Sequence, residues 1–276
     1  MNCREALAKA RRVLEESNIE NPSLEGEILL KHILGVNRAV LFSNLDKELT
    51  PDEKEKLTNL LERRKTGEPS SYIVGHREFY GLDFKVDKRV LIPRPETELL
   101  VEKTIECCRQ CEFSSIADIG TGSGCIAISL AINLPEITIY ATDISLPALE
   151  VAEENISAYH IKDRINLMWG DLLKAIPEQV DMIAANLPYV KKDEITSLFE
   201  PERALNGGKD GLEKITELCC QLPGKLKSKG ILLLEIGQGQ VETVVNNLHN
   251  IFPSSIIEVT KDLAGIERVV SLRLTS

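Results

Sequence analysis

The chain of 276 residues carries 33 Lys and Arg against 43 Asp and Glu, which gives a formal net charge of −10. An acidic chain without a Lys/Arg-rich block lacks the basic surface with which nucleic acid-binding proteins neutralise phosphates, so its composition argues against a direct nucleic acid partner. Apolar residues make up 43% of the chain, which is enough for a substantial core.

The sequence gives no sign of export or membrane insertion. Residues 1–5 lack a basic-then-apolar signal, and the longest apolar runs, such as residues 231–234, are too short to cross a bilayer. The seven cysteines show no regular disulfide spacing, and Cys108 and Cys111 form a lone C-x-x-C pair without a nearby His. We therefore expect a cytoplasmic protein with free thiols and no metal site.

Residues 1–70 are expected to form a small helical domain. Leu7, Ala10 and Leu14 recur at helical spacing, and a second apolar face ends near Gly35. The sequence T-P-D-E beginning at Thr50 is a strong start signal for a further helix, with Thr as N-cap and Glu three residues later.

The pattern becomes strand-like between Tyr72 and Ile92. Residues 79–84 predict a hairpin with its turn at Gly81-Leu82 or at Asp83, because glycine favours tight turns. We interpret residues 71–94 as a β-hairpin linker that packs against the domain that follows.

Residues 95–276 alternate strands with helical segments, which predicts an α/β fold with a mainly parallel sheet covered on both faces. The expected strands are residues 115–119, 137–142, 164–169, 180–185, 230–236, 255–259 and 268–274. Residues 260–267 are too few for a helical crossover between the last two strands, so that pair should be antiparallel.

A glycine-rich turn follows the strand at residues 115–119; it consists of Gly120, Thr121, Gly122, Ser123 and Gly124. Glycines let the backbone approach a ligand closely, and the free N–H groups at the start of the next helix favour polar or anionic groups. Cys125 stands where a dinucleotide-binding G-x-G-x-x-G would have its third glycine, which weakens an NAD-binding interpretation without removing it.

Two acidic residues follow the next two strands. Asp143 comes about 20 residues after the glycines, the usual place of an acid that holds ribose hydroxyls. Asp171 follows the strand at residues 164–169. Either acid could instead cap a helix, and for the helix that starts near Pro147 the cap could be Asp143 or Ser145.

The fourth strand ends in Asn186-Leu187-Pro188-Tyr189. The Asn side chain and the Leu187 backbone each offer a carbonyl acceptor, and the Tyr ring offers a flat face. Two acceptors beside an aromatic plane suit a planar NH2 group, either a side-chain amide or the exocyclic amine of a base. An ordinary Asn-Pro loop is the alternative for the tetrapeptide taken alone.

In this order the motifs resemble a known family. D-I-G-T-G-S-G followed by Asp143, Asp171 and N-L-P-Y is similar to class I methyltransferases that use S-adenosylmethionine. Within that class, four further segments resemble the PrmC/HemK family: L-I-P-R-P-E-T-E (91–98), E-P-E-R-A-L (200–205), G-G-K-D-G (207–211) and L-L-L-E-I-G (232–237). The resemblance spans nearly the whole chain and is weakest over the first seventy residues.

The resemblance implies a seven-stranded, mostly parallel Rossmann-like methyltransferase sheet with an antiparallel last strand over residues 95–276. It also implies that the helical domain at residues 1–70 recognises the substrate. Members of the family transfer a methyl group from S-adenosylmethionine, leaving S-adenosylhomocysteine, to the side-chain amide nitrogen of the glutamine in the Gly-Gly-Gln motif of peptide chain release factors. We accordingly expect a monomeric enzyme whose partner is a release factor.

The resemblance also implies roles for individual residues. Asn186 and Tyr189 would be catalytic, and the substrate amide would be held by Asn186, Leu187, Pro188 and Tyr189. The cofactor would contact Gly120, Thr121, Gly122, Ser123, Gly124, Asp143, Asp171, Leu172 and Asn186. Arg94 and Glu96 are expected to pair with each other or to cover the site, without a chemical role.

One departure from the family pattern leaves a rival open. Asn-Pro-Pro-Tyr is usual in the family, whereas this chain has Leu187 at the second position, and N-L-P-Y is similar to the form found in ribosomal RNA adenine dimethyltransferases. An adenine amino-group methyltransferase acting on RNA or DNA is therefore one alternative. A non-catalytic Rossmann-type binding protein is another.

Overall fold

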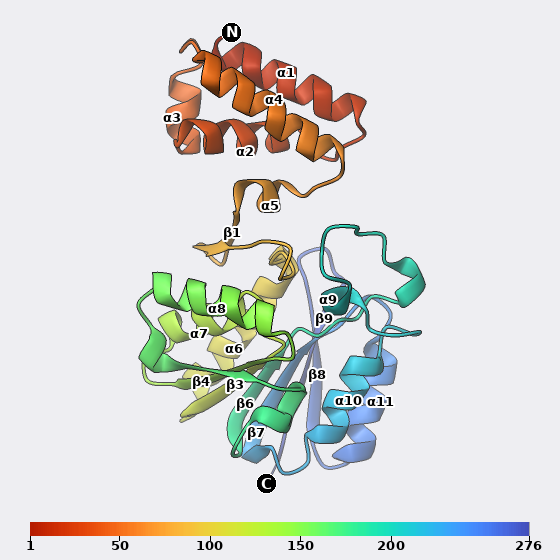
Figure 1. The fold of residues 1–276 in the computed structure, drawn as a ribbon. Coiled ribbons are helices and arrows are strands. Elements are labelled where there is room, and N and C mark those ends of the chain that lie inside the picture. The colour runs from red at the N-terminus through yellow and green to blue at the C-terminus, as the bar shows by residue number, and fades with distance from the viewer. Residues whose placement is uncertain (276) are drawn as a thin grey trace. The chain divides into compact units, whose positions relative to one another are not determined.

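The structure, a computed structural model, describes residues 1–275. The chain divides into two compact units, Met1–His76 and Arg77–Ser276 (Figure 1). Each unit has its own hydrophobic core, so each is described by itself.

The first unit is helical. It contains α1 (Cys3–Glu16), α2 (Pro22–Leu34), α3 (Arg38–Ser43), α4 (Pro51–Lys65) and α5 (Ser70–Val74). Thr50 caps α4 as expected: its side chain accepts the N–H of Glu53, and Glu53 accepts the N–H of Thr50 in return. The core contains the Ala10 and Leu14 positions that the helical spacing indicated, together with Leu30, Leu57 and Leu61.

The second unit is a seven-stranded sheet between two layers of helices, which confirms the predicted fold class. The strands are β3 (Ser115–Ile119), β4 (Thr138–Asp143), β5 (Ile165–Trp169), β6 (Val180–Ala185), β7 (Leu226–Glu235), β8 (Ile256–Lys261) and β9 (Glu267–Arg273). Their order is β5-β4-β3-β6-β7-β9-β8, and β9 is antiparallel to both of its neighbours. The order reverses between β3 and β6, which is where ligands bind in open α/β sheets.

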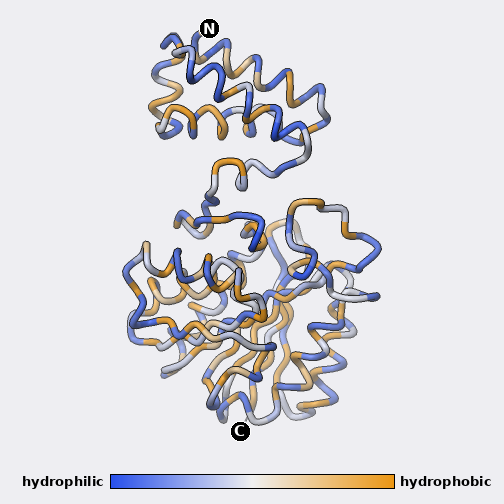
Figure 2. Tube along the Cα trace, in the orientation of Figure 1, coloured by the Kyte–Doolittle hydropathy of each residue, from blue (hydrophilic) through white to orange (hydrophobic). Residues whose placement is uncertain are grey.

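Helices cover both faces of the sheet (Figure 1). On one face lie α6 (Glu98–Gln110), α7 (Cys125–Asn133) and α8 (Leu146–Ala158), and on the other lie α10 (Glu213–Gln221) and α11 (Val241–Ile251). The central strands are apolar on both sides, as Figure 2 shows by their orange colour, because they are buried beneath helices on both faces.

Some sequence-based boundaries were wrong. Tyr72 was expected to begin strand-like structure, but it lies in α5. The hairpin joins β1 (His76–Phe79) to β2 (Leu82–Lys85) through Tyr80 and Gly81, both at positive φ, so the turn precedes the expected position. The short helix α3 was not predicted, because six residues are too few to show helical periodicity.

A single carboxylate joins three strands at the edge of the sheet where β3 and β6 begin. Asp181 Oδ2 accepts hydrogen bonds from the backbone N–H and hydroxyl of both Ser114 and Ser115, at 2.8–3.1 Å, and from Lys227 Nζ at 2.8 Å. Burial alone would raise the pKa of Asp181, but these bonds, led by the one from Lys227, lower the pKa to about 2.

We predict that Asp181→Asn lowers the free energy of unfolding by about 1.5–3 kcal/mol at pH 7, because bonds to a charged acceptor are lost. The folded-state pKa lies below the ordinary value of 3.8, so this contribution is complete above about pH 5 and is lost as the pH falls toward 2. Urea unfolding across this range measures it, with the exposed Asp163→Asn as control. Equal stability of wild type and Asp181→Asn at pH 7 would contradict the prediction.

Candidate functional site

A cavity of about 260 Å³ lies at the carboxyl ends of the central parallel strands. Its wall is built from the segments that follow β3, β4, β5 and β6, together with residues 89–91, Pro201, Arg203, Ala204 and Lys214. Of the residues predicted from the sequence, the wall contains Gly120, Gly122, Asp143, Asp171, Leu172, Asn186, Leu187 and Pro188. Residues from four separate motifs therefore meet in one place.

The glycine turn after β3 lies directly against the tetrapeptide after β6. Gly120 has φ +76°, and the N–H groups of Gly120 and Thr121 both donate to the Thr142 carbonyl at 2.9 Å. A Cβ on Gly120 would lie 3.2 Å from Leu187 Cδ2 and 3.5 Å from the Asn186 carbonyl oxygen. Glycine is therefore required at position 120 for its backbone conformation and for close packing on Leu187.

Asp143, at the end of β4, is held by backbone N–H groups from both sides. Its Oδ2 accepts from Gly122 at 3.0 Å and its Oδ1 from Ser145 at 2.8 Å. Burial raises the pKa of Asp143, and these backbone bonds oppose the rise. Ser145 supplies the side-chain cap of α8, so the carboxylate keeps lone pairs that can accept hydroxyl groups from the cavity.

Asp171 and Leu172 form the wall beyond β5. Asp171 occupies the N-cap position of a short 3-10 helix but makes no side-chain cap bond; it pairs with Lys174 at 2.5 Å instead. Leu172 has φ +54°, a left-handed conformation that is costly for a residue with a side chain. A strained backbone at a cavity wall is typical of a ligand-binding position.

The tetrapeptide after β6 presents unused acceptors to the cavity. Asn186 Nδ2 donates to Thr97 Oγ1 at 2.9 Å, and among residues 1–275 no group donates to Asn186 Oδ1 or to the Leu187 carbonyl. Leu187 itself is buried, and Tyr189 is half-buried with its hydroxyl donating to Glu235 Oε1 at 3.2 Å. The side-chain amide of Asn186 is thus held through its Nδ2, and its Oδ1 remains available as an acceptor.

The segment at residues 207–211 supports the tetrapeptide through its glycines. A Cβ on Gly207 would lie 2.7 Å from the Pro188 carbonyl oxygen, and a Cβ on Gly211, which has φ +74°, would lie 2.4 Å from the Tyr189 carbonyl oxygen. Gln240 Nε2 donates to the carbonyls of Tyr189 and Gly211, each at 3.1 Å. This close backbone contact explains a motif that the sequence alone left without a role.

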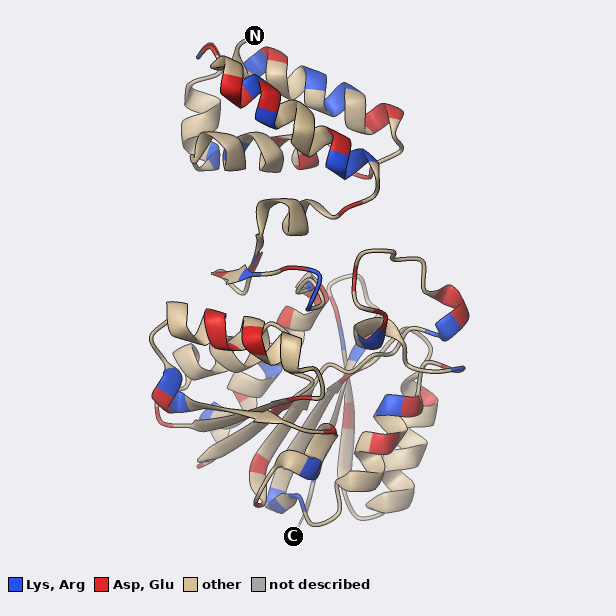
Figure 3. Ribbon diagram, in the orientation of Figure 1, with Lys and Arg blue, Asp and Glu red and all other residues tan. Residues whose placement is uncertain are grey.

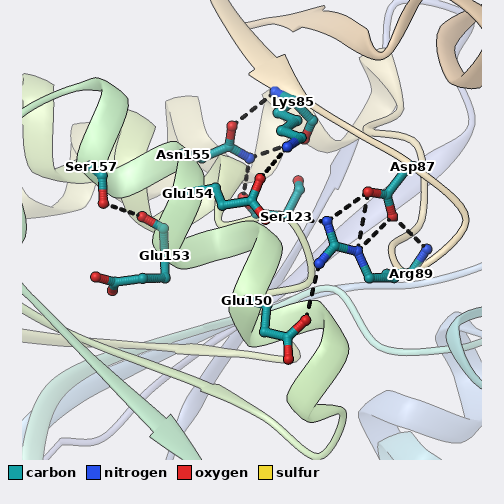
Figure 4. Close-up of polar contacts among 9 residues, drawn as sticks. All are labelled: Lys85, Asp87, Arg89, Ser123, Glu150, Glu153, Glu154, Asn155 and Ser157. Atoms are coloured by element: carbon teal, nitrogen blue, oxygen red, sulfur yellow. Dashed lines mark hydrogen bonds and ion pairs between the residues drawn. The ribbon is translucent and has the colours of Figure 1, made fainter.

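The segment of residues 85–91, part of which lines the cavity, is attached to α8 (Figure 4). Arg89, which lines the cavity, bonds both oxygens of Asp87 and reaches Glu150 and Glu154 on the helix. Asn155, also on α8, donates to the backbone carbonyls of Lys85 and Ser123 at 3.0 and 2.8 Å. Side chains of α8 therefore bond both residues 85–89 and the glycine turn.

Of the two alternatives for Arg94 and Glu96, the pairing of these residues with each other was wrong. Arg94 forms its ion pair with Glu200 at 2.6 Å, and Glu200 also accepts the N–H of Ile92 at 3.2 Å. The side chain of Glu200 is only 8% exposed. Glu200 comes from the loop after the tetrapeptide, so its bonds join that loop to residues 92–94. A pair of residues two positions apart could not do this.

Some predicted site residues lie off the cavity wall. The Thr121 hydroxyl donates to Asp118 at 2.6 Å, the Ser123 carbonyl accepts from Asn155, and Gly124 is the N-cap of α7. Tyr189 is absent from the cavity wall, and its hydroxyl donates to Glu235. Any contact of these four residues with a ligand stays a prediction. Sequence reasoning in turn missed wall or supporting residues, namely Arg89, Thr97, Lys214, Glu235 and Gln240.

Two wider features of the described residues bear on the class of site. Within residues 1–275, no group of three or more His, Cys, Asp and Glu is arranged to hold a metal ion. No helix in the same part of the chain is both long and apolar enough to cross a membrane.

Comparison with known proteins agrees with this geometry. Residues 5–75 match the PrmC N-terminal domain, and residues 95–249, more than half of the chain, match the methyltransferase small domain. The chain is 40% identical to the release factor glutamine methyltransferase of Moorella thermoacetica over 97% of both chains, and 39% identical to that of Koribacter versatilis over 98% of both. This chain belongs to the release factor glutamine methyltransferase family.

Solved structures support the fold of this family member. A methyltransferase from Pyrococcus furiosus matches with a TM-score of 0.54 at 16% identity, covering 71% of this chain and 90% of that one. A ribosomal protein L11 methylase from Lactobacillus delbrueckii subsp. bulgaricus matches with a TM-score of 0.50 at 24% identity, covering 67% and 80%.

We predict that Gly211→Ala displaces Tyr189 and lowers methyl transfer by about tenfold or more, since small misplacements at a reacting centre are costly. Gly239→Ala is the matched control, because Gly239 also has a positive φ (+81°) but a Cβ there would meet nothing within 4 Å. Gly211→Ala should be less stable than this control by at least about 1 kcal/mol in urea unfolding. Equal methyl transfer and equal stability of the two variants would show that the contact with Tyr189 is unimportant.

Proposed function

We propose that this chain methylates the side-chain amide nitrogen of the glutamine in the Gly-Gly-Gln motif of peptide chain release factors, with S-adenosylmethionine as methyl donor. The observation that carries the proposal is the pair of acceptors on the cavity wall, Asn186 Oδ1 and the Leu187 carbonyl, which receive no hydrogen bond within residues 1–275. An NH2 group has two hydrogens and fits such a pair.

The cavity fits the donor molecule on three counts. Gly120 and Gly122 allow the methionine portion to approach the backbone, because neither carries a Cβ and both have positive φ. Asp143 offers carboxylate lone pairs to two ribose hydroxyls. Asp171 and the strained Leu172 would border the adenine. When bound there, S-adenosylmethionine supplies an electrophilic methyl group on its sulfonium.

The work of the protein is to place and polarise a poor nucleophile. The lone pair of an amide nitrogen is delocalised into its carbonyl, so fixing that nitrogen in line for attack can lower the barrier by up to about 7–11 kcal/mol. Asn186 Oδ1 and the Leu187 carbonyl would accept the two amide hydrogens. These bonds strengthen as the nitrogen becomes positive, which stabilises the transition state more than the ground state.

No dedicated base is needed in this mechanism, because a protonated N-methyl amide is a strong acid and loses its proton to solvent. None of the four histidines lines the cavity. Tyr189 would stack on the amide plane of the substrate. Burial, together with the nearby Glu235, raises the pKa of the Tyr189 hydroxyl, so the hydroxyl stays protonated and keeps donating to Glu235.

Charge and sequence similarity support a protein partner over RNA. The net charge is −10, and Figure 3 shows acidic and basic residues mixed along the helices of both units. Leu187 supplies the same backbone carbonyl as the usual Pro, so we infer that its presence leaves the amide chemistry intact. We further propose that the helical unit contacts the release factor, that the enzyme is monomeric and that it acts in the cytoplasm.

The substrate class can be tested directly with a radiolabelled methyl donor. We expect label to enter a purified release factor at the glutamine of Gly-Gly-Gln and to be absent from ribosomal RNA offered in the same reaction. A release factor with that glutamine changed to Glu should stay unlabelled. Label in the RNA would instead support the adenine methyltransferase alternative.

We predict that Asn186→Ala lowers kcat by at least about 100-fold, as expected for loss of a transition-state acceptor. The dissociation constant of S-adenosylhomocysteine should change by no more than a few-fold, measured by calorimetry. Asn166→Ala, an exposed asparagine on β5, serves as control. If Asn186→Ala lost cofactor binding and turnover equally, Asn186 would serve the cofactor and not the amide.

For Asp143→Ala we predict that the main effect is on cofactor binding. Loss of the ribose acceptor should weaken S-adenosylhomocysteine binding by about tenfold or more, since bonds to charged groups contribute about 1.5–3 kcal/mol. The exposed Asp163→Ala should bind as wild type does. An unchanged dissociation constant for Asp143→Ala would remove Asp143 from the ribose.

A further inference from the structure

The segment of residues 235–240, at the end of β7 and in the turn that follows it, contacts Tyr189 at three places. β7 runs parallel to β6, with Leu234 paired to Ala185, so the residues after each strand leave the sheet at the same edge. The contacts reach the hydroxyl, the ring and the backbone of Tyr189, and the mechanism above uses only the first. Together they point to a further role for the L-L-L-E-I-G motif, to which the sequence resemblance assigned none.

Two of the contacts hold the side chain of Tyr189. Its hydroxyl donates to Glu235 Oε1 at 3.2 Å, and Glu235 is fully buried as the last residue of β7. Gly237 lies against the ring, because a Cβ at this position would come within 3.1 Å of Tyr189 Cδ2. The Tyr189 side chain is therefore held at its hydroxyl and along one edge of its ring.

The third contact comes from Gln240, whose side chain is buried and hydrogen-bonded at both ends. Nε2 donates to the backbone carbonyls of Tyr189 and Gly211, each at 3.1 Å. Oε1 accepts the backbone N–H of Gly237 at 2.8 Å. Because a carbonyl only accepts and an N–H only donates, these partners leave the amide a single orientation. One side chain therefore joins the tetrapeptide, the 207–211 segment and the turn after β7.

Gln240 is itself held by the helix that it precedes. It is the N-cap residue of α11, and Val244 donates its backbone N–H to the Gln240 carbonyl at 3.1 Å. Val244 and Leu248 of α11 are fully buried in the core beneath the helix. The backbone that carries the Gln240 amide is therefore part of a packed helix, which makes this amide a fixed point for Tyr189.

A fixed Tyr189 ring matters for a reaction that depends on alignment. The ring is to stack on the substrate amide, and a misplacement of about 1 Å at a reacting group can lower the rate by about 100-fold. We propose that Gln240 is a positioning residue for methyl transfer, which with Glu235 and Gly237 forms a clamp that holds the Tyr189 ring in one plane beside the amide. This inference rests on the stacking role of Tyr189 in the proposed function.

Gln240→Met tests the clamp, because methionine fills a similar volume but makes none of these hydrogen bonds. We expect kcat to fall by about 10- to 100-fold, as for a displaced group at the reacting centre. The dissociation constant of S-adenosylhomocysteine should stay within about threefold of the wild-type value, because Gln240 does not line the cavity. Gln238→Met, at an exposed glutamine of the same turn, is the matched control and should keep wild-type kcat. Wild-type kcat in Gln240→Met, or a loss of cofactor binding in proportion to kcat, would overturn the proposal.

A double-mutant cycle with Tyr189→Ala separates positioning of the ring from a general structural defect. If Gln240 acts by holding the ring, Gln240→Met should lower kcat by less than about threefold once the ring has been removed, since residues that act together have non-additive effects. A defect that does not pass through Tyr189 would lower kcat by the same factor in both backgrounds. Such additivity would overturn the proposal.

The clamp can also be observed without turnover. In protein with 13C-labelled tyrosine, the ring signals of Tyr189 are assigned by comparison with Tyr189→Phe. We expect slow flipping of this ring in wild type and in Gln238→Met, and faster flipping in Gln240→Met, because side chains freed from packing change rotamer rapidly. Equal flipping rates in wild type and Gln240→Met would contradict the clamp.

If Gln240→Met does not fold, Gly237→Ala applies the same test. Gly237 has no positive φ, so alanine suits its backbone, and the added methyl would press on the Tyr189 ring and on Gln240 Oε1, each 3.1 Å away. We expect its kcat to fall by about tenfold with cofactor binding unchanged, and wild-type kcat there would overturn the proposal. A release factor left unlabelled by wild type would refute the proposed function, whereas the ring-flip comparison would still decide for or against the clamp.

Discussion

The hydrogen bond from Asn186 Nδ2 to Thr97 Oγ1 is the interaction on which the site depends. It fixes the Nδ2 end of the Asn186 amide and leaves Oδ1 as an acceptor on the cavity wall. The bond joins Asn186, which directly follows β6 at the carboxyl edge of the sheet, to Thr97, which directly precedes α6. The adjacent Leu187 packs on Gly120, so the glycine turn and the acceptor pair are parts of one rigid contact.

Carboxyl groups show how the two edges of the sheet differ. Asp181, at the edge away from the cavity, is surrounded by donors, and its pKa falls to about 2. At the cavity edge, burial raises the pKa of Asp143 and brings the pKa values of Asp118 and Glu235 to about 7. The first arrangement stabilises the fold, whereas the second keeps poorly solvated acceptors near the place where a ligand is expected. Perturbed carboxyls gathered at one edge are typical of a functional site.

Hydrophobic periodicity and the positions of polar residues after strands predicted most of the fold and the cavity-lining residues that follow the parallel strands. The strands, the antiparallel last pair, the Thr50 cap and the meeting of Gly120, Asp143, Asp171 and Asn186 all follow from local patterns and from the geometry of parallel sheets. Contacts between distant segments could not be predicted this way. The Arg94–Glu200 pair, the Thr97–Asn186 bond and the packing of Gly211 on Tyr189 join residues far apart in the chain, and no short-range pattern encodes such partners.

The most direct test of the central claim is a crystal structure of the protein with S-adenosylhomocysteine and a peptide containing Gly-Gly-Gln. We expect the ribose at Asp143, the sulfur next to residue 186, and the glutamine NH2 between Asn186 Oδ1 and the Leu187 carbonyl. A sulfur bound far from Asn186, with no opening between them, would contradict the account.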